Sequence, residues 1–161
     1  MNEYNAIQPP GDPQIGNLAT PLNSSDFSKT LIRNLPAYRD GLAPFRRGLE
    51  VGMAHGYILY GPFLVLGPLR NTGSADIAAL LSSVGLVAIL TLCLSLYATA
   101  MGGKPTETVT TGNVPQTFAT KEGWSEFGSG FFIGGAGGAF FAYFLLSTAY
   151  LGDIRTLIPG L

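Results

Sequence analysis

The sequence predicts an all-α membrane protein, with three transmembrane helices that follow an extended N-terminal arm and a short amphipathic surface helix. Only 12% of its 161 residues are charged, which is about half the share found in an average soluble domain. No aspartate, glutamate, lysine or arginine occurs in the stretches 51–69, 77–103 and 127–151. An apolar stretch of about 20 residues can cross a bilayer as a helix, so each of these stretches predicts one crossing.

Residues 1–47 are predicted to lie on one side of the membrane, as an arm followed by a surface helix. The first 23 residues contain four prolines and two glycines, which break helices and favour an extended conformation. The segment 24–36 predicts a short helix that a serine can cap, with apolar residues at four-residue spacing, namely Phe27, Leu31 and Leu35. So short a helix gains its stability from a membrane surface or a partner. The N-terminus lacks the basic start and apolar run of a cleaved signal peptide, so we expect the mature protein to begin near Met1.

The three predicted transmembrane helices span residues 48–67, 77–101 and 127–151, within a membrane domain of residues 48–161. Glycines recur at four-residue spacing in the first and third of them, as Gly48, Gly52 and Gly56 and as Gly130, Gly134 and Gly138. Stripes of small residues allow another helix to approach closely. They would equally admit a flat ligand, so the stripes alone leave both interpretations open.

The basic residues predict the orientation of the chain. With three crossings, the arm and the loop between the second and third spans share one side of the membrane. That side carries Lys29, Arg33, Arg39, Arg46, Arg47, Lys104 and Lys121, whereas the other side carries only Arg70 and Arg155. Because basic residues concentrate on the cytoplasmic side, we expect the N-terminus to lie in the cytoplasm or its equivalent.

The first span carries two ionisable residues, Glu50 and His55, and His55 is the only histidine in the sequence. Ionisable groups at membrane depth cost about 2.5–3.5 kcal/mol or more unless something satisfies them, so they are functional candidates. Five residues of helix place the two side chains about 140° apart around the axis and about 7.5 Å apart along it. One metal ion is therefore not easily held by both. The spacing predicts two separate sites on two faces, with His55 on the side of the glycine stripe.

Three interpretations compete for His55. It could donate a hydrogen bond to a neighbouring helix. It could bind a haem iron, whose second axial ligand would then come from Met53, Met101 or another subunit. It could bind the magnesium of a tetrapyrrole, which needs a single axial donor.

Glu50 also has more than one interpretation. Its carboxylate offers the oxygen ligand that magnesium favours, and it could equally pair with Arg46 or Arg47 within about one helical turn. The spans contain no nucleophile with a base, no phosphate-binding loop and no polar cluster, so we predict that the protein is not an enzyme. The net charge of −1 indicates neither nucleic acid nor acidic substrates as partners.

Two sequence runs are specific enough to indicate a family. The runs NLPAYRDGLAPFRRGLEVGMAHGYILYGPF (34–63) and KEGWSEFGSGFFIGGAGGAFFAYFL (121–145), with LGPLRN between them, closely resemble the photosystem I reaction-centre subunit XI family, PsaL, of the cyanobacterial type. The resemblance implies a non-catalytic membrane subunit that supports light harvesting and mediates oligomerisation. It implies chlorophyll a and β-carotene as pigments, with lipid as a further ligand. It also assigns Glu50 and His55 as axial ligands of chlorophyll magnesium.

The same resemblance implies partners and a location. The partners are the photosystem I core subunits, small membrane subunits and neighbouring copies of the chain in trimers or other oligomers. The location is the cyanobacterial thylakoid membrane, or the plasma membrane where thylakoids are absent. Some members associate a calcium ion with the contact between copies, which makes Pro68 and Asn71 the candidate residues here. The family pattern PLRD reads PLRN in this chain, and the loss of a carboxylate predicts weaker calcium binding.

Two other functions stay open at the level of the sequence. One is a haem-binding membrane anchor subunit of an oxidoreductase, in which His55 would be an iron ligand. The other is an assembly factor that binds no pigment.

Overall fold

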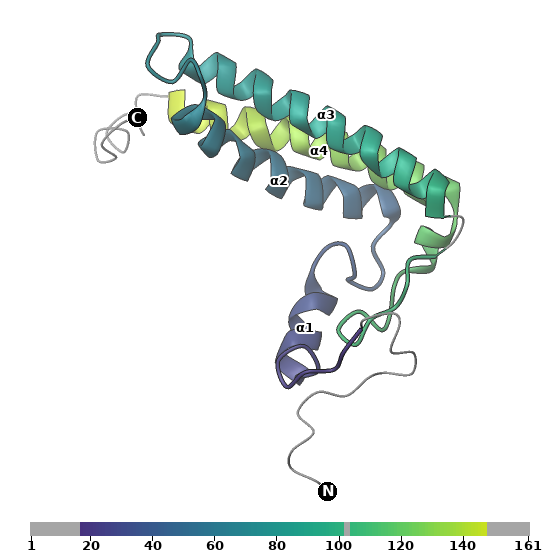
Figure 1. Ribbon diagram of the computed structural model, residues 1–161. Helices are drawn as coiled ribbons and strands as arrows, with labels where there is room; N and C mark the ends of the chain where they lie inside the picture. Colours follow the sequence, from purple (N-terminus) through teal and green to yellow (C-terminus); the bar gives the residue numbers. More distant parts are fainter. Residues whose placement is uncertain (1–16, 102–103, 148–161) are drawn as a thin grey trace, which may run out of the picture.

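The computed structural model describes residues 17–101 and 104–147. Its elements within these ranges are helical: α1 (Asp26–Asn34), α2 (Pro44–Leu66), α3 (Ala75–Met101), the 3-10 helix η2 (Gln116–Ala119) and α4 (Lys121–Ser147). The helices α2, α3 and α4 lie side by side, and α1 lies apart from them near one end of the bundle (Figure 1). All three long helices have the length and apolar composition to cross a membrane. The predicted all-α membrane fold with three spanning helices is therefore confirmed.

The short helix α1 has the amphipathic character that its sequence predicts. Ser25 caps it, because the Ser25 side chain accepts a hydrogen bond from the Ser28 backbone N–H at 3.2 Å. None of its residues is buried, and Phe27 and Leu31 are 74% and 53% exposed. The rest of the described chain thus leaves the apolar side of α1 open for a membrane surface or a partner.

The segment before α1 and the connection between α3 and α4 lie on the same side of the bundle, as predicted. The Asn17 side-chain oxygen accepts a hydrogen bond from the Val109 N–H at 3.2 Å. The Thr110 hydroxyl donates to the Asn23 carbonyl at 3.1 Å. The extended arm predicted for the first 23 residues lies mostly outside the described residues.

Two of the long helices begin earlier than the hydropathy of the sequence predicts. The helix α2 begins at Pro44, with proline at its first position, where the missing N–H costs no hydrogen bond. The helix α4 begins at Lys121, after the Thr120 hydroxyl, which accepts a hydrogen bond from the Gly123 N–H at 3.1 Å. The predicted membrane spans begin at 48 and 127, inside these two helices. Of the predicted end of the third span, residues 148–151 lie outside the described residues.

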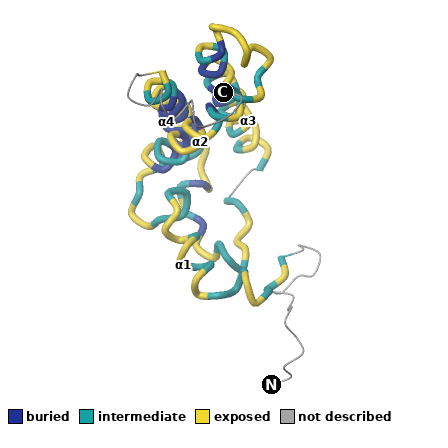
Figure 2. The backbone as a smooth tube through the Cα atoms, turned by 90° about the vertical axis from the view of Figure 1, so that its left-hand side faces the viewer, coloured by how far each residue is buried: buried dark blue, intermediate teal, exposed yellow. Residues whose placement is uncertain are grey.

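The helices α2 and α4 meet backbone to backbone along a surface that we call the α2–α4 seam. It consists of Gly48, Gly52 and Gly56 on α2 and Gly130, Gly134 and Gly138 on α4, and all six are buried. A Cβ atom added to any of them would collide with backbone atoms of the opposite helix. In Figure 2 the buried residues gather where these two helices meet. The glycine stripes therefore serve helix packing, which was one of their two interpretations.

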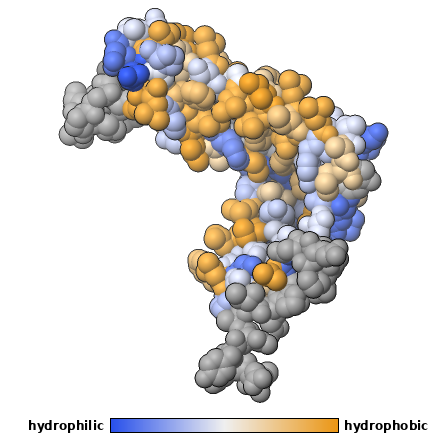
Figure 3. Space-filling model, in the orientation of Figure 1, coloured by the Kyte–Doolittle hydropathy of each residue, from blue (hydrophilic) through white to orange (hydrophobic). Residues whose placement is uncertain are grey.

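The helix α3 packs through side chains instead. Near the α2–α3 loop, a core of seven buried residues joins the three helices, namely Tyr60, Leu64, Ala75, Ala79, Leu80, Ala139 and Ala142. At the opposite end, Val114, Phe118 and Phe127 form a second core. Apolar side chains cover most of the visible face of the bundle and polar ones gather at its two ends (Figure 3). This distribution matches a bilayer around the middle of the bundle.

Candidate functional site

His55 lies on the outside of α2, where the helix itself orients its ring. Nδ1 lies 2.8 Å from the Val51 carbonyl oxygen, and because a carbonyl only accepts hydrogen bonds, Nδ1 must carry the proton. The lone pair of Nε2 is then free to bind a metal from outside the chain. The Phe131 ring of α4 packs edge-on against the imidazole, with centroids 5.5 Å apart and planes at 61°.

This geometry bears on the alternatives for His55. Its hydrogen bond goes to its own helix, whereas one interpretation required a bond to a neighbouring helix. The prediction placed His55 on the glycine side of α2. In the structure α4 fills that side, and the exposed His55 lies at its edge beside Phe131. Met53 lies two residues before His55, about 200° around the helix, so the two side chains cannot ligate one iron from α2.

Glu50 is held by two arginines. One carboxylate oxygen accepts a hydrogen bond from the Arg39 guanidinium at 2.5 Å, and the other accepts one from Nε of Arg46 at 3.1 Å. Each oxygen keeps a further lone pair, and the side chain is 28% exposed. The carboxylate is therefore oriented by the protein and still open to a metal at its outer side.

Arg39 is the residue at this site that sequence reasoning missed. The predicted partners were Arg46 and Arg47, which lie within one helical turn of Glu50. Only Arg46 pairs with it; the buried Arg47 donates instead to the carbonyls of Pro36 and Ala37, at 3.1 and 3.2 Å. Arg39 lies before α2 in the chain and reaches Glu50 from outside the helix. Between Arg39 and the start of α2 the chain turns at Gly41, which has a φ of 76°. Only Gly41 could have hinted at this reversal, because a glycine tolerates positive φ.

An apolar hollow lies close to Glu50 on the same face of α2. Met53, Ala54 and Tyr57 line it from α2, and Gly137, Gly138 and Phe141 line it from α4, around a volume of about 340 Å³. We call it the Met53 hollow. Its α2 residues follow Glu50 at helical spacings of three, four and seven, which places all of them on one face. Glu50 therefore lies on the side of α2 that carries the Met53 hollow, and His55 lies on the other side, beside Phe131.

The candidate calcium residues lie in the loop between α2 and α3. Pro68 and Asn71 are exposed there, and the Arg70 guanidinium donates to the Gly67 carbonyl at 3.2 Å. Within residues 17–101 and 104–147, no group of three or more histidine, cysteine, aspartate or glutamate side chains could hold a metal ion. The loop thus offers backbone carbonyls and one amide oxygen, which are weak calcium ligands without a carboxylate.

These features define a multi-pass helical membrane protein that presents single donor groups and apolar surfaces to its surroundings. Such an arrangement suits the binding of apolar ligands and of neighbouring membrane subunits. The family described as photosystem I reaction centre subunit XI matches residues 6–151. The subunit XI of Crocosphaera subtropica is 61% identical over 148 residues, which cover 92% of this chain and 95% of that protein.

Two further cyanobacterial relatives agree. The photosystem I reaction center subunit XI of Synechococcus elongatus is 60% identical, covering 93% of this chain and 92% of that protein. That of Picosynechococcus is 63% identical, covering 85% and 90%. The chain belongs to the photosystem I reaction centre subunit XI family. It is a structural, multi-pass thylakoid membrane subunit associated with other photosystem I subunits, and it is not an enzyme.

Proposed function

We propose that this subunit binds chlorophyll a through His55 and Glu50, binds β-carotene along its apolar surfaces, and supports both light harvesting and oligomerisation of photosystem I. One observation carries the proposal: the bond from Nδ1 of His55 to the Val51 carbonyl leaves Nε2 free and directed away from the helix. An imidazole in this tautomer is a ready axial ligand that needs no second protein donor.

The residues around His55 suit a flat, apolar ring system. The Val51 carbonyl fixes the imidazole, and Phe131 limits its rotation. Ile58, three residues after His55 on the same face, is 66% exposed and offers an apolar surface. Chlorophyll supplies light absorption and excitation transfer when bound, and the protein sets the position and orientation of its ring.

Glu50 suits a second chlorophyll on the other face. Its carboxylate can ligate magnesium through an outer lone pair while Arg39 and Arg46 hold the inner ones. The adjoining Met53 hollow is almost wholly apolar, and the Tyr57 and Phe141 rings beside it lie 6.2 Å apart. A macrocycle can rest against such a surface without leaving polar groups unpaired.

The outer side of α3 supports the proposed carotenoid and subunit contacts. Large apolar side chains are exposed along its length, namely Ile77, Leu81, Ile89, Leu92 and Leu96. A contiguous surface of this kind binds apolar ligands, lipid or neighbouring membrane helices. For contacts between copies of the complex, Pro68 and Asn71 remain the candidate calcium residues, with weak binding expected.

The distribution of basic residues supports a cytoplasmic N-terminus. The arm side of the bundle carries Lys29, Arg33, Arg39, Arg46, Arg47, Lys104 and Lys121, while the α2–α3 loop carries Arg70. Arg155 lies outside the described residues. Such an asymmetry orients membrane proteins with the basic side in the cytoplasm.

Substituting His55 tests the proposal. His55→Leu should remove one chlorophyll per copy of the subunit from the purified photosystem I complex, while the subunit still assembles. Leu66→Ile, at the exposed far end of α2 and outside both proposed pigment sites, should leave the pigment content unchanged. A His55→Leu complex with every chlorophyll in place would contradict the role of His55. The absorption spectrum separates the haem alternative, since a haem gives redox-sensitive bands that chlorophyll lacks.

A further inference from the structure

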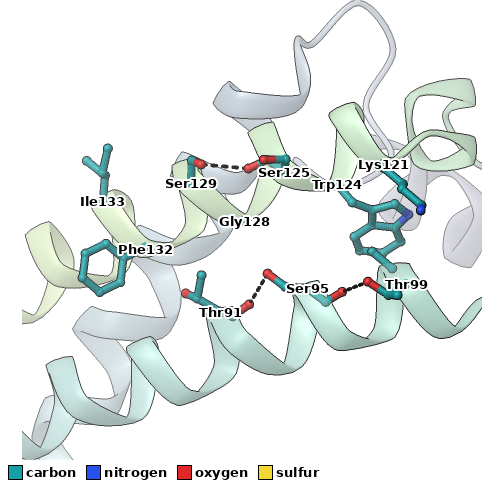
Figure 4. Close-up of a pocket in the computed structure, with 11 residues that line it drawn as sticks. Thr91, Ser95, Thr99, Lys121, Trp124, Ser125, Gly128, Ser129, Phe132 and Ile133 are labelled. Carbon is teal, nitrogen blue, oxygen red and sulfur yellow. Dashed lines mark hydrogen bonds between the residues drawn. The ribbon is translucent and has the colours of Figure 1, made fainter.

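The contact between α3 and α4 opens into a groove that the proposed pigment sites do not use. It has a volume of about 480 Å³, within the range of small-molecule sites. Five of its lining residues carry hydroxyl groups: Thr91, Ser95 and Thr99 on α3, and Ser125 and Ser129 on α4 (Figure 4). We call it the hydroxyl groove. So many hydroxyls on facing helices indicate a polar occupant.

Most of these hydroxyls have already used their proton. Thr91, Ser95 and Thr99 donate to the carbonyls four residues before them, at 2.8, 3.1 and 2.9 Å. Ser129 does the same toward the Ser125 carbonyl at 2.8 Å. A hydroxyl has one proton and two acceptor lone pairs, so these four offer acceptors to the groove. Their best ligand is one with several O–H or N–H donors.

The two ends of the hydroxyl groove differ in polarity. Lys121 and Trp124 line one end, and Phe132 and Ile133 line the other (Figure 4). Lysine and tryptophan concentrate at the membrane interface, and Ile133 lies about 18 Å further along the helix than Lys121. The groove thus runs from the headgroup level into the hydrocarbon. This gradient matches a lipid with its headgroup among the hydroxyls and its chains along Phe132 and Ile133.

The charges near the polar end indicate an uncharged headgroup. Among the residues that line the groove, Lys121 is the charged one. It also borders a separate shallow patch that Glu122 and Glu126 line, so the two carboxylates outnumber the one ammonium group beside the polar end. A phosphate or sulfate headgroup would meet this excess of negative charge, and an ammonium headgroup would lie close to Lys121. The indole N–H of Trp124 donates to the Phe118 carbonyl at 2.7 Å, so Trp124 offers the groove only its ring.

We propose that the hydroxyl groove binds a glycolipid, meaning a diacyl lipid with an uncharged sugar headgroup. The sugar hydroxyls donate to the oxygens of Ser95 and Ser129. Thr91 and Thr99 lie about 12 Å apart along α3, on either side of Ser95, and bound the site. The Lys121 amine donates to the sugar in return. The site lies apart from Glu50 and His55, so it goes beyond the proposed pigment function and can fail independently of it.

Filling the groove tests the proposal in the intact complex. A Cβ atom at Gly128 meets only the Thr91 methyl group, at 3.9 Å, so the Cβ of Gly128→Leu enters the groove lining without striking backbone, and the rest of the side chain takes up groove volume. Gly85→Leu is the matched control, since a Cβ at Gly85 meets nothing within 4 Å. Photosystem I would be purified in a detergent without a sugar headgroup, and its lipids counted by mass spectrometry. Gly128→Leu should lose one glycolipid per copy of the subunit, and Gly85→Leu none, with chlorophyll content equal in both.

A second variant removes the acceptors and leaves the volume almost unchanged. Ser95→Ala combined with Ser129→Ala should weaken rebinding of monoglucosyl diacylglycerol from vesicles about fivefold for each hydroxyl removed. Vesicles of phosphatidylglycerol should bind wild type and variant equally. This variant also decides the question if the Gly128→Leu complex does not assemble. Unchanged glycolipid in every variant would overturn the proposal, and so would the loss of a phospholipid or a pigment in its place.

Discussion

The α2–α4 seam and the packing of α3 are two ways of joining helices within one small bundle. Along the seam, glycines bring the backbones together, so that even one added Cβ would overlap the opposite helix. On α3, side chains make the contact, and Gly85 and much of its length remain open. In a bilayer, close backbone approach and van der Waals packing drive association, because lipid removes the usual hydrophobic gain. The seam thus leaves no space between the two backbones, whereas the contact between α3 and α4 leaves the hydroxyl groove open.

The largest expected effect breaks the seam. Gly56→Ala places a Cβ atom against the backbone of Gly135 and Ala139, which cannot yield as a side chain can. We expect a loss of stability of about 3 kcal/mol or more, at the upper end of overpacking. The measurement is the temperature at which the subunit dissociates from the purified complex. Gly85→Ala is the control, and it should be neutral or stabilising by up to about 1 kcal/mol. Equal dissociation temperatures would contradict the backbone-to-backbone seam.

An intermediate effect is expected where α3 meets α4. The fully buried Val87 packs its methyl groups against Gly135, so Val87→Ala leaves a small cavity at this contact. We expect a cost of about 1–2 kcal/mol, since the substitution removes two methyl groups and Gly135 loses its contacts with them. Val84→Ala, one turn earlier and only partly buried, should cost less in the same dissociation assay. A cost at Val87 as large as that of Gly56→Ala would remove the contrast between the two interfaces.

The smallest expected effect concerns Arg39, which joins the arm to α2. Because the Arg39–Glu50 pair is partly exposed, Arg39→Ala should cost about 1 kcal/mol or less in stability. Its main effect should be a shift in the absorption or circular dichroism of the chlorophyll proposed at Glu50, since the carboxylate loses one orienting bond. Arg33→Ala, in the last turn of α1, is the control and should leave both spectra unchanged. Identical spectra for Arg39→Ala and wild type would contradict a positioning role for Arg39.

Hydropathy marks the part of a helix that lipid can cover, so the predicted membrane spans begin inside α2 and α4 and not at the first residues of these helices. Four of the six residues from Lys121 to Glu126 are polar and three of them are charged, so this stretch does not read as part of an apolar span although it is helical. Its signal was Thr120, whose hydroxyl caps the helix. The corresponding signal on α2 was Pro44, which is typical of a first helical position.

The sequence by itself determined the three spanning helices, the shared side of the arm and the α3–α4 connection, and the placement of Glu50 and His55 on different faces of α2. These properties depend on local composition and on the fixed rotation of a helix, so no neighbour is needed to read them. The tertiary structure decided that α4 packs on the glycine side of α2, beside His55. It also decided that Arg39, from before the Gly41 turn, reaches Glu50, and that hydroxyls of α3 and α4 line one groove. Each of these depends on the approach of segments far apart in the chain, which only packing in three dimensions establishes.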